Sequence, residues 1–88
     1  MQHVKIRVTG RVQGVYFRDT ARREAENYGI AGFARNDADG SVYIEAEGSD
    51  EAIQKFLDWC HQGSRDAVVE DVVHTHHEPV GHRGFDVR

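Results

Sequence analysis

The residues best suited to chemistry lie in a glycine-rich segment from Gly10 to Arg18. Gly14 permits a backbone curl in which successive amide N–H groups point inward, an arrangement that binds anions. Arg18 follows at the start of an expected helix, whose N-terminus adds partial positive charge. A guanidinium there could bind two oxygens of a phosphate while the loop amides bind the others. The same spacing is also typical of an ordinary tight strand-to-helix turn with an exposed arginine.

Asn36 is a second candidate, because it ends an expected strand just before an Asp-Gly turn. A neutral amide can hold a water molecule by donating one hydrogen bond and accepting another. Asparagine is also common at the opening of such turns. Taken alone, Asn36 therefore favours a structural interpretation.

Histidines form the other conspicuous group, and four of them fall near the C-terminus: His74, His76, His77 and His82. On a strand His74 and His76 would share a face, and Glu78 or His82 could supply a third metal ligand. Nothing in the spacing fixes that geometry. We therefore expect surface or partly buried histidines and no metal site.

The spacing of hydrophobic residues predicts the order of the helices and strands that carry these residues, which is β-α-β-β-α-β. Val4, Ile6 and Val8 alternate as in a strand, and Ile53, Phe56, Leu57 and Cys60 have the spacing of a helix face. The remaining elements are predicted at about Arg18–Tyr28 (helix), Ile30–Asn36, Ser41–Glu47, Ala67–His76 and Phe85–Arg88 (strands), with Ser49 or Asp50 capping the second helix and Gly63 ending it. This order predicts a single α+β domain over residues 1–88, a ferredoxin-like sandwich with both helices on one face of an antiparallel sheet.

Composition narrows the class of protein. The 88 residues are 39% hydrophobic and 30% charged, as in a globular domain, and no apolar run exceeds three residues. Residues 1–35 carry seven Lys/Arg against three Asp/Glu, a net charge of +4, whereas residues 36–88 carry four against twelve, or −8. The overall charge of −4 argues against nucleic-acid binding. Cys60 is the only cysteine, which excludes an internal disulfide. We expect a cytoplasmic monomer that binds no membrane.

Two segments resemble the signatures of the acylphosphatase family. The first, from Val8 to Arg18, contains Gly-Arg-Val-Gln-Gly-Val and ends in Phe-Arg. The second begins at Gly32 with Gly-Phe-Ala-Arg-Asn and continues with Gly40, Val42 and Gly48. Together they span about half of the chain, and the remaining elements suit the family's ferredoxin-like fold.

This resemblance implies an acylphosphatase that hydrolyses the carboxyl-phosphate bond of a small acyl phosphate. It implies a phosphate-binding loop made of Gln13, Gly14, Val15, Tyr16, Phe17 and Arg18. Arg18 would bind the phosphoryl oxygens and Asn36 would orient the attacking water. Inorganic phosphate and sulfate would compete for the loop, and no cofactor or metal is implied.

Two alternatives share this fold class, and the first is a binding module. An RNA-recognition module needs stacking aromatic residues on its open sheet face, but here Tyr43 stands beside Glu45 and Glu47. A metal-transport module would need paired cysteines after the first strand, and there are none. A segment serving carbamoyl-phosphate chemistry inside a larger enzyme is the second alternative. The short chain makes us prefer the stand-alone enzyme.

Overall fold

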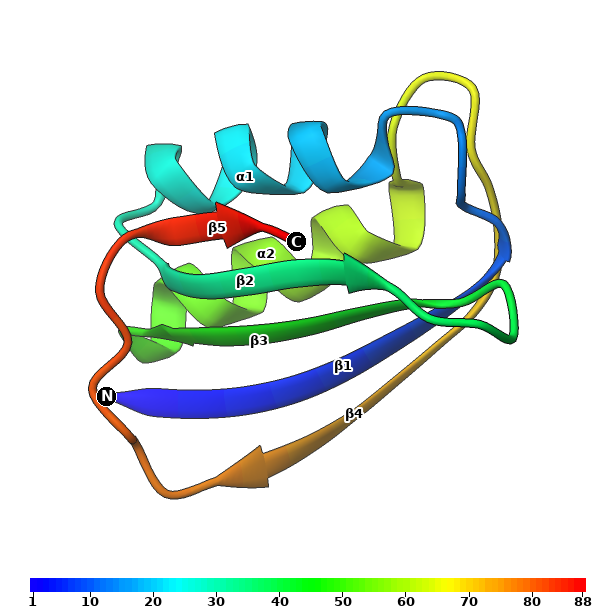
Figure 1. Ribbon diagram of the computed structural model, residues 1–88. Coiled ribbons are helices and arrows are strands. Elements are labelled where there is room, and N and C mark those ends of the chain that lie inside the picture. Colours follow the sequence, from blue (N-terminus) through cyan, green and yellow to red (C-terminus); the bar gives the residue numbers. More distant parts are fainter.

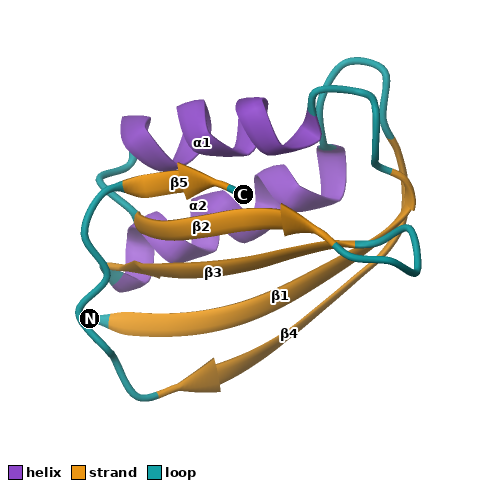
Figure 2. Ribbon diagram, viewed as in Figure 1, coloured by secondary structure: helices purple, strands orange, loops and turns teal.

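Residues 1–88, described by a computed structural model, form two layers: a five-stranded sheet and two helices that cover one of its faces (Figures 1 and 2). In chain order the elements are β1 (Gln2–Arg11), α1 (Phe17–Asn27), β2 (Ala31–Asn36), β3 (Val42–Gly48), α2 (Asp50–Gln62), β4 (Val68–His77) and β5 (Phe85–Val87). The predicted α+β order is confirmed, and boundaries move by one or two residues. Neither helix is long and apolar enough to cross a membrane.

The sheet has the strand order β4-β1-β3-β2-β5. The four long strands pair antiparallel, as predicted. The short strand β5 instead lies parallel to β2, with Phe85 opposite Gly32, so the sheet as a whole is mixed. This pairing carries the C-terminal residues to the sheet edge beside α1 (Figure 1).

The hydrophobic core lies between the sheet and the helices. Alternation in β1 buries Val4, Ile6 and Val8, each at most 1% exposed. From the helix side, Phe56 is fully buried, and Cys60 is the small core residue that the sequence predicts. Burial of one large aliphatic or aromatic side chain contributes roughly 1.5–3 kcal/mol, so this interface is the main source of folding stability.

A bulge in β1 directs the chain out of the sheet toward the glycine-rich loop. The β1–β4 register shifts between Thr9 and Gly10, and β1 continues through Gly10 to Arg11. Gly10 has φ of +120°, and a Cβ there would lie 2.2 Å from the carbonyl oxygen of Val68. Only glycine permits this close approach, so Gly10 is required for the path that the loop takes.

Helix ends follow the predicted signals. Ser49, rather than Asp50, caps α2, since its hydroxyl oxygen accepts the N–H of Ala52 at 3.2 Å. The chain leaves α2 at Gly63, whose N–H donates to the carbonyl of Trp59. Helix α1 begins one residue before the predicted position, because Phe17 is already helical and packs its ring against Trp59.

Candidate functional site

A cavity of about 300 Å³ lies where the N-terminus of α1 meets the ends of β2 and β5. Eight residues from four segments line it: Val12, Gly14, Tyr16, Phe17, Arg18, Asp19, Asn36 and Val87. The structure therefore brings Arg18 and Asn36, eighteen positions apart in the sequence, to one cavity.

The loop between β1 and α1 is held at both ends by buried side chains. Val12 is 1% exposed and Val15 is 6% exposed, so both belong to the core. Gly14, which lies between these two valines, has φ of +74°, and Tyr16, which follows Val15, has φ of +62°. A Cβ at Gly14 would meet no atom within 4 Å, so glycine is needed there for its dihedral angle and not for space.

The N-terminus of α1 opens on the cavity. Tyr16 occupies the N-cap position without a side-chain capping bond, and its carbonyl accepts the N–H of Thr20 at 3.1 Å. The first N–H groups of a helix have no partner within the helix. Here they belong to Phe17, Arg18 and Asp19, which all line the cavity. Together with the helix dipole they provide positive potential for an anion.

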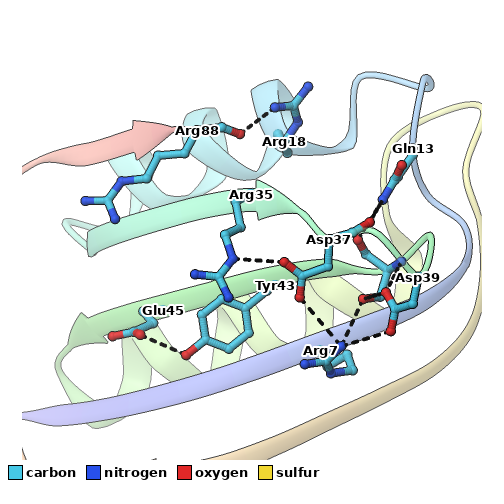
Figure 3. A network of polar contacts seen from close by, with 10 residues as sticks. Arg7, Gln13, Arg18, Arg35, Asp37, Asp39, Tyr43, Glu45 and Arg88 are labelled. Carbon is cyan, nitrogen blue, oxygen red and sulfur yellow. Dashed lines mark hydrogen bonds and ion pairs between the residues drawn. The ribbon is translucent and has the colours of Figure 1, made fainter.

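Arg18 is held in place by the C-terminal end of the chain. Its Nη1 donates to the backbone oxygen of Arg88 at 2.6 Å (Figure 3). A guanidinium carries five N–H donors, so this one bond leaves others for a ligand. Arg88, the residue that follows β5, thus orients the arginine through its backbone, and β5 itself contributes Val87 to the cavity wall.

Asn36 reaches the cavity because of strand alternation in β2. Ala34 is fully buried against the helices, and Asn36, two residues later, lies on the same side. Arg35 lies on the opposite face, where its guanidinium stacks over the ring of Tyr43 at 4.4 Å. The amide of Asn36 is exposed, as access to water requires.

The glycine-rich loop and the β2–β3 turn are tied together by Gln13. Its side-chain amide donates to the carbonyl oxygens of Asp37 and Ser41 at 2.8 and 2.9 Å (Figure 3). Ion pairs hold the turn from the other side, since Arg7 contacts Asp39 at 3.1 Å. Hydrogen bonds from the hydroxyl and backbone N–H of Ser41 lower the pKa of Asp39, which keeps this carboxylate ionised.

The expected phosphate-binding stretch divides into residues that reach the cavity and residues that support it. Gly14, Tyr16, Phe17 and Arg18 line it, whereas Gln13 and Val15 do not. Val15 turns its side chain into the core, and its carbonyl accepts the hydroxyl of buried Ser64 at 2.7 Å. Gln13 and Val15 can therefore contribute only backbone groups to phosphate binding.

Three lining residues were missing from the sequence-based site: Val12, Asp19 and Val87. Val12 and Asp19 flank the predicted stretch, so proximity could have found them. No sequence signal points to Val87, which arrives only through the β5–β2 pairing.

The four C-terminal histidines do not converge. His74 and His76 share a face of β4, as predicted, with ring centroids 5.3 Å apart. His77 and His82 instead both lie against His3, at centroid distances of 5.9 and 5.5 Å. The fold therefore divides the four histidines into two pairs.

Comparisons with known proteins point to one family. The sequence model of the Acylphosphatase family matches residues 4–87. The chain is similar to an acylphosphatase of Rubrobacter xylanophilus, with 45% identity over 99% of this chain and 80% of the relative. An acylphosphatase of a Nocardioides species is 48% identical over 97% of this chain and 86% of its own length. The crystal structure of acylphosphatase from Bacillus subtilis has a TM-score of 0.98 and 38% identity, with 100% and 99% of the two chains covered.

Proposed function

The chain belongs to the acylphosphatase family, and on that premise we propose that its glycine-rich loop and Arg18 bind the phosphoryl group of an acyl phosphate while Asn36 orients the attacking water. The reaction consumes one water and yields a carboxylate and inorganic phosphate. The observation that carries this proposal is the shared cavity, which places Arg18, Asn36 and the N-terminus of α1 around one space of about 300 Å³.

Charge stabilisation accounts for the binding step. The N–H groups of Phe17 to Asp19 and the remaining donors of Arg18 can together bind the three phosphoryl oxygens. Because Arg88 already orients the guanidinium, little ordering is left to occur when substrate binds. A phosphoryl group so held develops its transition-state charge against fixed positive groups.

Positioning accounts for the chemical step. Asn36 can donate one hydrogen bond to an attacking water and accept another from it. A carboxylate is a good leaving group, so the reaction does not require a strong base or a covalent nucleophile. We propose that a phosphoryl oxygen of the substrate takes the water's proton as the water attacks phosphorus and the P–O bond to the carboxylate breaks.

A phosphate-release assay tests this function. Benzoyl phosphate and acetyl phosphate are the substrates, and ATP and a phosphomonoester are the controls. We expect rapid release from both acyl phosphates and none above background from the controls. Release at the uncatalysed rate from both acyl phosphates contradicts the proposal.

An RNA-binding role finds no support on the open sheet face. Tyr43 donates its hydroxyl to Glu45 at 2.8 Å and lies under Arg35. Two carboxylates, Glu45 and Glu47, follow it along β3. An aromatic ring in that setting offers a poor stacking platform for a polyanion.

A further inference from the structure

The connection between β4 and β5, residues 78–84, is here called the strap. Because β4 and β5 are the two outer strands, the strap must pass the ends of β1, β3 and β2 (Figure 1). Three consecutive strap N–H groups, those of Val80, Gly81 and His82, donate to the carboxylate of Glu47. The Glu47 side chain is 2% exposed, so the strap buries a carboxylate as it crosses the sheet.

His3 lies beneath the strap and contacts oxygen on both sides of its ring. Nδ1 is 2.9 Å from the carbonyl oxygen of Glu78, and Nε2 is 2.9 Å from Oε1 of Glu45. A carbonyl and an ionised carboxylate can only accept hydrogen bonds, whereas a neutral imidazole has one N–H to donate. Both ring nitrogens of His3, which is 2% exposed, therefore face hydrogen-bond acceptors.

His82 extends this cluster from the strap. Its Nε2 is 3.1 Å from the same Oε1 of Glu45, and its ring lies edge-on to that of His3. The hydroxyl of Tyr43 donates to the other oxygen of Glu45. Two imidazoles and two carboxylates thus converge from β1, β3 and the strap.

The cluster is mostly withdrawn from water. The side chains of His3 and Glu47 are each 2% exposed, and those of Glu45 and His82 are 16% and 19% exposed. Buried carboxylates are paired with other groups or bind metals.

We propose that His3, Glu47 and His82 form a binding site for a divalent transition-metal ion, Zn²⁺ in preference to Mg²⁺, which fastens the strap to the sheet. One ligand atom from each of the three residues lies within 4.8 Å of the others. Two imidazoles and one carboxylate are a common Zn²⁺ ligand set, whereas Mg²⁺ prefers oxygen ligands.

Each donor group can bind a metal and keep part of its present hydrogen bonding. Of the about four lone-pair sites of Glu47 the strap uses two on Oε2 and one on Oε1, so the remaining site is on Oε1. His3 binds through one ring nitrogen while the other keeps its hydrogen bond, the usual arrangement of a metal-bound imidazole. Ligand atoms around tetrahedral Zn²⁺ lie about 3.3 Å apart, so the strap closes slightly on the ion.

The site is separate from the candidate active site. His3 stands nine residues before Val12, which is about 25–30 Å along β1. The start of β1 and the glycine-rich loop accordingly lie at opposite ends of the strand (Figure 1). The metal therefore has a structural role, and this inference does not rest on the proposed function.

The test measures Zn²⁺ and Mg²⁺ binding to the full chain after removal of metals with EDTA. Calorimetry should give one Zn²⁺ per chain, and Tm should rise with Zn²⁺ but not with Mg²⁺. The His82→Gln variant should bind Zn²⁺ more than about tenfold more weakly, since loss of an outer-sphere partner alone costs that much. The matched control, His74→Gln with His76→Gln, removes the exposed pair on β4 and should bind as the unmodified chain does.

Imidazole NMR on the unmodified chain keeps the test independent of variant folding. Zn²⁺ should shift the ring resonances of His3 and His82 and leave those of His74 and His76 in place. No binding, or binding lost in the His74/His76 variant and kept in His82→Gln, overturns the proposal. Acyl phosphate hydrolysis, measured in parallel, should be equal with Zn²⁺ and with EDTA. Failure of the active-site proposal therefore appears as absent hydrolysis and failure of the metal site as an unchanged Tm.

Discussion

Replacement of Asn36 by alanine should separate catalysis from binding. The side chain is exposed and lines the cavity without any hydrogen bond to another residue, so its removal should change folding stability by no more than about 0.5 kcal/mol. The phosphate contacts that we assign to the loop and Arg18 remain. If Asn36 orients the water, kcat should fall by about 100-fold, which corresponds to about 2.7 kcal/mol of barrier.

The assay is steady-state hydrolysis of benzoyl phosphate with inorganic phosphate as competitive inhibitor, and circular dichroism checks the fold. The inhibition constant for phosphate should stay within about twofold while kcat falls. Asn27→Ala is the matched control, because Asn27 is an exposed asparagine at the other end of α1 and should leave kcat unchanged. A folded Asn36→Ala variant with normal kcat would remove Asn36 from the mechanism.

Four further predictions test the site and its supports. Arg18→Gln should raise KM and lower kcat together, because a charged phosphoryl contact acts in both the ground and transition states; normal phosphate inhibition in the folded variant would exclude Arg18 from the cradle. Inorganic phosphate should raise Tm above that in chloride at matched ionic strength, because at one hundred times its Kd it adds about 2.7 kcal/mol to the free energy of unfolding. Equal Tm values in the two salts would argue against a preformed cradle. EDTA should leave hydrolysis unchanged, since Arg18 and backbone amides supply the positive charge; loss of rate restored by Mg²⁺ or Zn²⁺ would contradict this. Burial and a hydrogen bond to Glu45 raise the pKa of Tyr43 to about 12, so the folded state favours the neutral phenol and stability should fall as pH rises from about 10 to about 12. Denaturant titrations across that range should show a shallower fall for Tyr43→Phe, and identical slopes would refute the assignment.

Local sequence patterns predicted the elements because each pattern has its own physical cause. Alternation in β1 and the i, i+3, i+4 spacing in α2 follow directly from one-sided burial. Pairing between distant segments leaves no such mark. The three residues of β5 carry no pattern that indicates a parallel partner, and Val87 was therefore missed as a cavity residue.

The direction of side chains in the loop could not be predicted from the sequence. The resemblance to the family signature implies a phosphate loop built from the backbone of six consecutive residues, and it does not show that the side chains of Gln13 and Val15 turn away from the cavity. Periodicity could not separate them, because the positive φ values at Gly14 and Tyr16 break any regular alternation. The positions of the C-terminal histidines could not be predicted for a related reason, since the strap carries His82 across the sheet to His3.

The cavity is held by bonds from three separate parts of the fold. Gln13 joins the loop to the β2–β3 turn, Ser64 bonds to the carbonyl of Val15, and the backbone of Arg88 orients Arg18. Each of these hydrogen bonds is accepted by a backbone oxygen, so each depends on the path of the chain and not on a partner side chain. Strained or left-handed backbone persists only where its surroundings determine it strongly. These hydrogen bonds meet that condition around Gly14 and Tyr16, and the cradle should therefore bind phosphate without rearrangement of the loop.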